Sequence, residues 1–266
     1  MTLHPARHPL ATVLVLAGFL RVSSAAGLDK VAPALDPAPR LTMKFDGPLG
    51  ARLRANLENW ELRIPDADPA LTEMFSDREQ SQSRNLLPWS GEFVGKYLNA
   101  SILSYRILRD PRQKIMIDRV VHALLKSQDS DGYLGPFDKQ HRLTGRNWDL
   151  WGHYWAIRGL LLYYEEFGDK DALNASTRAA DLIVNTFLNR GIPLTNDESF
   201  GQMNYAIIHA FTKLYRVTHK SSYLNMAEWI VKQWDQPGAG LYMRMALAGR
   251  DMFEFPGNRW ESVHDF

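Results

Sequence analysis

One stretch, residues 148–169 (WDLWGHYWAIRGLLLYYEEFGD), constrains the fold of this chain more than any other. From Leu150 its apolar residues recur at steps of four, three, four and three, which is the spacing of one helical face. A second apolar stripe, which begins at Trp151, runs beside the first. A helix that is apolar around so much of its circumference is buried against several neighbours. The stretch therefore predicts an inner helix of an all-α protein.

A repeated pattern extends this prediction along the chain. Tyr105, Tyr164 and Tyr215 each lie near the end of a mostly apolar segment, and a short polar turn and an amphipathic segment follow each of them. The tyrosines are 59 and 51 residues apart, so the unit is an αα-hairpin with a variable loop. Inner apolar helices that alternate with outer amphipathic helices build a helical toroid or solenoid. We therefore predict an (α/α) toroid of αα-hairpins, which is incomplete in this chain.

The same periodicity divides the chain into regions. Residues 27–84, rich in proline and alanine at their start, are predicted to form an extended lead-in with short helices. Residues 85–266 are predicted to hold the partial toroid, with 148–167 as an inner helix and 171–188 as an outer helix, since the first is apolar over a wider arc. The other predicted helices cover residues 50–61, 87–109, 112–127, 200–217 and 222–234.

The N-terminus has the pattern of a secretory signal peptide. Arg7 and His8 precede eleven apolar residues at positions 10–20, and small residues follow up to Ala26. A charged start, a short apolar core and a small-residue exit are typical of an export signal that is removed, and the core is too short to anchor the protein in a bilayer. We expect residues 1–26 to be cleaved and the mature protein to be secreted or periplasmic, free of the membrane.

Composition excludes some classes of partner. The 266 residues include 31 basic and 30 acidic side chains, a net charge of +1, so no basic footprint for nucleic acid is present. The chain contains no cysteine, which rules out disulfides and any thiolate metal site within these residues. Nothing in the sequence predicts the oligomeric state.

Four segments together resemble a known family. They are LPWSGEFVGKYLNAS from residue 87, KSQDSDGYLGPF from residue 126, the stretch at 148–169, and LYRVTHKSSYLNMAEWIV from residue 214. The most specific elements are Gln128 with the following GYL, and the GHY at a predicted helix start. The segments resemble the N-terminal catalytic region of the β-L-arabinofuranosidase family of glycoside hydrolases, family 127, over roughly residues 85–266. The resemblance implies an (α/α)6 barrel, incomplete in this chain, followed by β-sandwich domains.

The resemblance implies an exported glycoside hydrolase that acts on arabinofuranosides or related plant-type glycans, so carbohydrate is the expected partner. Family members use a cysteine nucleophile beside a zinc ion held by further cysteines and a glutamate. Because this sequence has no cysteine, neither nucleophile nor zinc ligand is assigned to any residue, and zinc is expected only in a longer parent protein. We expect that parent to hydrolyse arabinofuranosides and this piece alone to be weak or inactive. The alternative is a non-catalytic helical toroid that binds carbohydrate or protein.

Three residues at or near predicted helix starts are the candidates for catalysis. Glycosidases use an acid/base carboxyl and a second group across the scissile bond. Glu92 and Asp149 are the candidate carboxyls, and His153 lies four residues after Asp149 on the same helical face. Each also has a structural explanation: Glu92 as a partner of the helix dipole, Asp149 as an N-terminal cap, and His153 as a hydrogen-bonded rim histidine.

The candidates for substrate binding have aromatic or polar side chains. Most of them lie near the rim of the predicted toroid, where the inner helices are expected to begin. Indole and phenol rings provide faces for sugars to stack on, and amide, imidazole and carboxylate groups bind hydroxyls, although packing explains many of them equally well. Glu261 and His264 are three residues apart and share a face suited to substrate or metal. The full set is Trp89, Trp148, Trp151, Tyr154, Asn204, His209, Glu261 and His264.

Overall fold

The computed structural model describes residues 43–83, 85–145, 147–194, 202–236 and 241–254. The chain divides into two units, Met1–Pro37 and Ala38–Phe266, and the first lies wholly outside the described residues. The predicted signal peptide therefore lies outside them as well, and so do Glu261 and His264.

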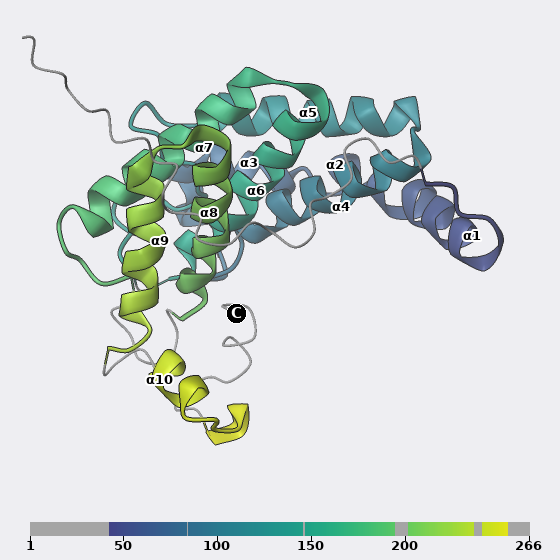
Figure 1. The fold of residues 1–266 in the computed structure, drawn as a ribbon. Helices are drawn as coiled ribbons and strands as arrows, with labels where there is room; N and C mark the ends of the chain where they lie inside the picture. The colour runs from purple at the N-terminus through teal and green to yellow at the C-terminus, as the bar shows by residue number, and fades with distance from the viewer. Residues whose placement is uncertain (1–42, 84, 146, 195–201, 237–240, 255–266) are drawn as a thin grey trace, which may run out of the picture. The chain divides into compact units, whose positions relative to one another are not determined.

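The described residues of the unit Ala38–Phe266 form three αα-hairpins with shorter helices before and after them, and they include no strand (Figure 1). The helices pack as an (α/α) toroid does: α4 packs on α6, α6 packs on α8, and each of the three packs on the helix that follows it. Figure 1 shows the last hairpin as two helices side by side, α8 and α9. The inner helices are α4 (Glu92–Leu108), α6 (Asp149–Phe167) and α8 (Ile208–Thr218), and the outer helices are α5 (Pro111–Ser127), α7 (Lys170–Ile183) and α9 (Ser221–Gln233).

Burial separates the inner from the outer helices. Thirteen of the nineteen residues of α6 are buried, whereas six of the fourteen residues of α7 are buried and all six lie on one face. A wide apolar arc needs neighbours on several sides, and α6 has them in α4, α7 and α8. The predicted inner position of residues 148–167 and outer position of 171–188 are confirmed.

The tyrosine repeat marks the end of each inner helix. The residue that follows the helix has a left-handed backbone, with φ of 53°, 75° and 56° in the three hairpins. Its N–H donates to the carbonyl oxygen of the repeated tyrosine four residues earlier, which closes the last turn. The three pairs are Arg109 with Tyr105 at 2.9 Å, Gly168 with Tyr164 at 2.8 Å, and His219 with Tyr215 at 2.7 Å.

Two of the outer helices begin at an aspartate that caps them. The carboxylate of Asp110 accepts from the N–H of Arg112 at 2.8 Å. In the same way, Asp169 accepts from the N–H groups of Asp171 and Ala172 at 2.9 and 3.0 Å. These bonds satisfy N–H groups that have no partner inside the helix, so the chain reverses direction sharply and begins the outer helix at once.

Several predicted helices differ from the observed ones at their ends. The helix predicted from residue 87 begins at Glu92, because the N–H groups of Ser90 and Glu92 bond to carbonyls three residues earlier and form tight turns. The segment predicted as one helix from residue 200 begins as the 3₁₀ helix η5 (Gln202–Ile207) and continues as α8. In two places an α-helix ends in a π-helical turn: η4 (Val184–Leu188) follows α7, and η2 (Leu57–Glu61) follows α1 (Gly47–Asn56).

The remaining elements are short. They lie before the first hairpin or after the last. They are α2 (Ile64–Ala67), α3 (Ala70–Ser76), η3 (Arg78–Ser83), α10 (Tyr242–Leu247) and η6 (Met252–Glu254).

Glycines allow α4 and α6 to approach closely. A Cβ atom added to Gly95 of α4 would lie 2.1 Å from the carbonyl carbon of Trp155 of α6. One added to Gly159 of α6 would lie 2.9 Å from Cβ of Leu98, and Gly91 and Gly152 face each other at the start of the pair. The two backbones are therefore in direct contact, which brings the beginnings of both helices together.

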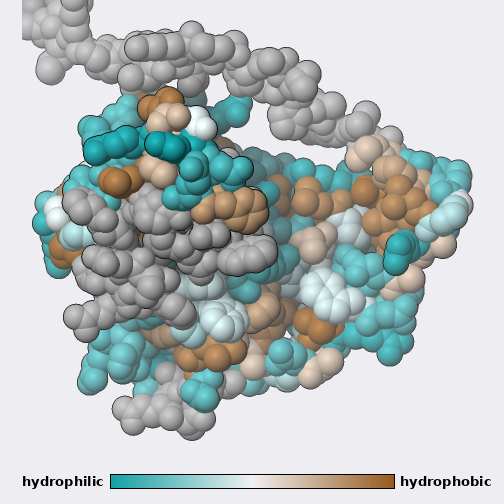
Figure 2. Space-filling model, turned by 90° about the horizontal axis from the view of Figure 1, so that it is seen from below, coloured by the Kyte–Doolittle hydropathy of each residue, from teal (hydrophilic) through white to brown (hydrophobic). Residues whose placement is uncertain are grey.

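Some large apolar side chains stay exposed in the described part of the chain. Phe93 and Leu103 lie on one face of α4 with 47% and 45% of their surface exposed. The face of the molecule in Figure 2 likewise shows apolar surface interleaved with polar surface. No helix of the described residues combines the length and the hydropathy of a membrane span.

Candidate functional site

Most of the predicted site residues that the structure describes gather at the beginnings of α4 and α6. Trp89 and Trp148, which precede the two helices, pack ring on ring with centroids 5.4 Å apart. One turn further on, Glu92 of α4 accepts a hydrogen bond from the indole N–H of Trp151 of α6. The close contact between α4 and α6 thus keeps the beginnings of the two helices together, and this region is called the rim below.

Asp149 is the hub of a buried network. Its side chain is 2% exposed, and both carboxylate oxygens lie 3.0 Å from the hydroxyl of Tyr133. The N–H of Leu143 also donates to it, at 2.8 Å. Burial, and next the charge of Asp149, raise the pKa of the Tyr133 hydroxyl well above its ordinary value, so the hydroxyl remains a donor. The network ties the loop that contains Tyr133 and Leu143 to the start of α6.

His153 is fully buried next to this network. Its Nε2 accepts from the N–H of Leu134 at 3.1 Å, so that nitrogen carries no proton. Its Nδ1 lies 2.9 Å from the carbonyl oxygen of Asp149, to which it donates, and 3.3 Å from the Asp149 carboxylate. Both ring nitrogens therefore bind the protein itself.

Asn204 caps α6 from a distant part of the sequence. Its Oδ1 accepts from the N–H groups of Leu150 and Trp151 at 3.1 and 3.3 Å, two of the N–H groups that a helix leaves unpaired at its start. Its Nδ2 donates to the carbonyl of Asn147 at 2.8 Å, and the residue is fully buried. The side chain is presented by the 3₁₀ helix η5, which precedes α8.

Glu92 remains at the edge of the buried region. Its side chain is 10% exposed, and its Oε1 lies 2.9 Å from the ammonium nitrogen of Lys96. Lys96 in turn is 39% exposed and lies over the rings of Trp151 and Trp155, at 5.5 and 5.3 Å from their centroids. One carboxylate oxygen of Glu92 is therefore bound by Trp151, and the other is paired with Lys96, which is accessible to solvent. Of the three predicted catalytic residues, Glu92 is the one with this access.

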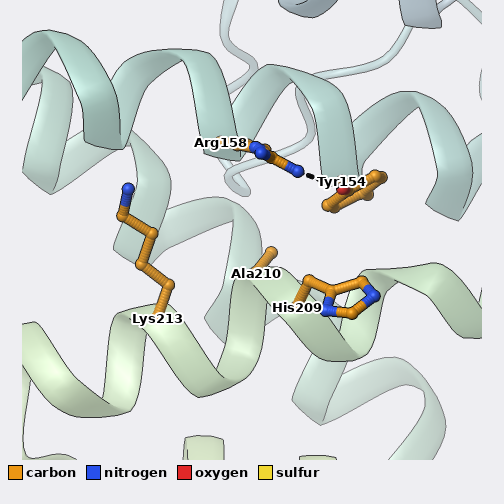
Figure 3. Close-up of a pocket in the computed structure, with 5 residues that line it drawn as sticks. All are labelled: Tyr154, Arg158, His209, Ala210 and Lys213. Carbon is orange, nitrogen blue, oxygen red and sulfur yellow. Dashed lines mark hydrogen bonds between the residues drawn. The ribbon is translucent and has the colours of Figure 1, made fainter. Parts of the chain in front are cut away.

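A pocket of about 280 Å³ lies between α6 and α8 (Figure 3). It contains two of the predicted substrate-binding residues, Tyr154 and His209, whose ring centroids are 5.9 Å apart. The hydroxyl of Tyr154 accepts a hydrogen bond from the guanidinium of Arg158 at 2.6 Å. Ala210 and Lys213 complete the lining.

The predicted site residues therefore fall into three groups. Asp149, His153 and Asn204 form the buried network, where their polar atoms bind the protein, and this favours a positioning role over direct contact with substrate. Their predicted catalytic and binding roles stay predictions. The rim group is Trp89, Glu92, Trp148 and Trp151, and the pocket group is Tyr154 and His209.

Four residues of these groups were not identified from sequence. Tyr133 lies in the GYL segment, so that motif was a usable signal for it. Arg158 interrupts an apolar face of the inner helix α6, and a cation in such a place is a signal for a polar cavity. Lys96 and Lys213 look like ordinary helix-surface cations in the sequence, and only the fold shows what they face.

The side chains present do not fit the zinc centre that the family resemblance implies. The sequence has no cysteine, and in the described ranges no three His, Asp or Glu side chains cluster in a way that holds a metal ion. No step of the chemistry is therefore assigned to zinc in this chain.

The hairpins, the inner and outer helices and the rim at the start of α4 and α6 define a protein of the (α/α) toroid class. The chain belongs to the family described as β-L-arabinofuranosidase, GH127 catalytic domain, which it matches over residues 44–250.

Known relatives agree with this assignment. The non-reducing end β-L-arabinofuranosidase of Bifidobacterium longum subsp. longum is 23% identical over 196 residues, which are 63% of this chain and 28% of that protein. The solved structure of a GH127 β-L-arabinofuranosidase from Geobacillus stearothermophilus T6 is 24% identical and covers 75% of this chain and 32% of its own, with a TM-score of 0.52. A GH127 β-arabinofuranosidase of known structure is 21% identical and covers 73% of this chain and 33% of its own, with a TM-score of 0.56. These structures share the fold, and the chain spans about a third or less of the length of each relative.

Proposed function

We propose that this protein is part of a glycoside hydrolase that releases arabinofuranose units from plant-type glycans. The observation that carries the proposal is the match to the GH127 catalytic domain over residues 44–250. The carboxyl group at the rim of α4 and the aromatic residues around it agree with it, because sugar sites combine aromatic faces with a few fixed polar groups.

Glu92 is the proposed proton-transfer group. Hydrolysis of a glycosidic bond requires a carboxyl that gives a proton to the leaving oxygen. Trp151 holds Oε2 of Glu92 and so fixes the plane of the carboxyl group. Its Oε1 faces the partly exposed Lys96, so a substrate oxygen that takes the place of the ammonium group would meet this atom. Proton exchange with substrate is therefore proposed at Oε1.

Asp149 and His153 are proposed as positioning residues. Their hydrogen bonds fix the loop of Tyr133 and Leu134 against the first turn of α6, where Trp148 and Trp151 lie. Loss of these bonds would move the rings that hold the sugar without removing a reacting group. The expected signature is a rise in KM with a smaller change in kcat.

The test is hydrolysis of a chromogenic β-L-arabinofuranoside by the protein expressed from its own gene. Glu92→Gln keeps the size of the side chain and is expected to lower kcat/KM by on the order of tenfold to thousandfold, or roughly 1.4–4 kcal/mol. Glu228→Gln, at an exposed position on α9, is the matched control and should leave kcat/KM unchanged. Thermal melts show whether each variant is folded. Failure of the folded, full-length wild-type protein to release arabinose would refute the proposal, and normal kinetics of Glu92→Gln in that protein would refute the role of Glu92.

The absence of cysteine favours a second candidate, a non-catalytic toroid that binds carbohydrate. It predicts binding of arabinofuranosides, seen as a change in tryptophan fluorescence, without release of sugar. The same wild-type assay separates the two candidates.

We also propose that the protein is exported, on the basis of the charged start, the apolar run and the small residues within positions 1–26. N-terminal sequencing of the protein from its host tests this. An intact Met1 on protein from the cytoplasm would contradict it.

A further inference from the structure

The pocket between α6 and α8 carries positive charge that a neutral sugar does not require. None of its five lining residues is acidic, whereas Arg158 and Lys213 are cations and His209 is an imidazole. Arg158 donates to the Tyr154 hydroxyl, and in the described part of the chain no carboxylate forms an ion pair with it. A half-buried guanidinium satisfied by one neutral hydroxyl keeps most of its donors available.

The second cation of the pocket has a carboxylate partner. Lys213 lies 3.0 Å from the carboxylate of Glu165, and Arg106, which lies 3.9 Å from the same carboxylate, pairs with Glu166 at 2.9 Å. Glu165 therefore balances the charge of Lys213, whereas no carboxylate among the described residues balances that of Arg158. The uncompensated guanidinium makes the pocket favour an anion.

The side chains converge from two helices. Figure 3 shows Arg158 and Tyr154 on α6, and His209 and Lys213 on α8, on opposite sides of one space. The planar fork of a guanidinium matches a carboxylate, to which it donates two parallel hydrogen bonds. The volume of about 280 Å³ lies just below the usual range of ligand sites, roughly 300–1,000 Å³, and so suits one small ring better than an oligosaccharide.

The pocket is connected to the rim that contains Glu92. The ring of Tyr154 lies 5.5 Å from Trp151, the partner of Glu92, and 5.9 Å from His209 in the pocket. Tyr154 therefore touches both places. The rim and the pocket are therefore adjacent along α6.

We propose that this pocket binds the carboxylate of a uronic acid unit, so that the natural substrate is an acidic glycan. Arg158 provides the bidentate contact, Lys213 provides a further donor from α8, and Tyr154 provides the ring face. The proposal rests on the proposed hydrolase function, because it names the substrate class of that same site.

The test compares the binding of galacturonate, galactose and inorganic phosphate, by titration of tryptophan fluorescence on the protein expressed from its own gene. Galacturonate and galactose share the ring and differ in the carboxylate. Galacturonate is expected to bind at least about tenfold more tightly than galactose, since hydrogen bonds to charged groups are the strong ones. It should also bind more tightly than phosphate, because phosphate has no ring to pack on Tyr154.

Variants assign the effect to the pocket. Arg158→Gln keeps a donor for Tyr154 and should weaken galacturonate about tenfold to hundredfold while leaving galactose unchanged. Arg158→Lys keeps the charge without the fork and should recover part of the loss. Lys126→Gln, at an exposed position on α5, is the matched control and should bind like the wild type. If Arg158→Gln fails to fold, Lys213→Gln takes its place.

The outcomes separate this proposal from the hydrolase function. Equal binding of galacturonate and galactose, binding of phosphate as tight as galacturonate, or an unchanged Arg158→Gln overturns the uronate pocket. Release of arabinose together with any of these leaves the hydrolase intact. Arg158-dependent binding of galacturonate without release of arabinose supports the pocket and overturns the hydrolase.

Discussion

Substitution of Gly95 by alanine tests the contact that keeps the beginnings of α4 and α6 together. An added Cβ would lie 2.1 Å from the carbonyl carbon and 2.2 Å from the carbonyl oxygen of Trp155. Carbon atoms in contact are normally about 3.5–4.0 Å apart, so α4 and α6 must separate locally by more than about 1 Å. Backbone atoms cannot turn aside as a flexible side chain would.

The cost follows from two opposing effects. Alanine favours a helix interior over glycine by about 1 kcal/mol, which would stabilise the variant. Overpacking costs about 1–3 kcal/mol, and a gap of 0.5–1 Å removes roughly a quarter to a half of the attraction between the separated atoms. Val94 and Leu98, both fully buried on α4, lie in the separated region. Because the clash is with backbone atoms, the upper end of this cost applies, and we expect a net loss of about 2 kcal/mol, which corresponds to a decrease in Tm of about 4–8 °C.

The assay is urea denaturation followed by circular dichroism. Gly152→Ala is the matched control in the same helix pair, since its Cβ would lie 3.3 Å from Gly91, and we expect it to change the free energy of unfolding by no more than about 1 kcal/mol. Because the bond from Trp151 to Glu92 also joins α4 to α6, the Gly95 variant should lose activity as well. A Gly95→Ala protein as stable as Gly152→Ala would refute the reasoning.

Three further predictions concern buried polar groups. Burial raises the pKa of Glu61 above its ordinary 4.5, so the folded protein retains a proton that the unfolded chain loses, and stability falls as pH rises from about 4.5 through the folded-state pKa. Glu61→Gln should therefore show a smaller fall in Tm than the wild type between about pH 4 and pH 7. Parallel Tm curves for the two proteins would contradict this. Arg78 binds the carbonyls of two residues and the carboxylate of Asp129 at 2.6 Å, so Arg78→Met should cost about 3–5 kcal/mol in urea denaturation, and a loss below about 1 kcal/mol would contradict it. Tyr133→Phe removes the donor that Asp149 shares between its two oxygens and should cost about 1–3 kcal/mol by the same measurement, whereas an unchanged midpoint would show that water replaces the hydroxyl.

The fold was largely predictable from local patterns. The 3.6-residue period and the wide apolar arc of residues 148–169 correctly predicted a buried inner helix, and the three tyrosines correctly marked the ends of the inner helices. The missed features depend on distant partners. The 3₁₀ start of the last inner segment accompanies the contact of Asn204 with α6, and apolar periodicity contains no information about such a contact.

For the candidate site, the sequence indicated where the helices begin but not how far the side chains are buried. Glu92 and Asp149 are the first residues of α4 and α6, and His153 lies one turn into α6. The sequence did not show that the loop of Tyr133 covers Asp149, because that loop has no periodicity and its hydrogen bonds depend on its path. Arg158 was missed for a different reason: the partner that makes it part of a pocket lies on α8, more than fifty residues further along the chain.

The three left-handed turns have a consequence for synthesis on the ribosome. Each joins an inner helix to its outer helix through only two residues, at positions 109–110, 168–169 and 219–220. Short loops close easily, so each hairpin can form as soon as its second helix has left the exit tunnel. The main neighbour of α4, however, is α6, which ends forty residues after α5 does. At about 5–20 residues per second, the first hairpin waits roughly 2–8 seconds with its apolar inner face uncovered, and in that interval the nascent chain is most exposed to aggregation and to capture by chaperones.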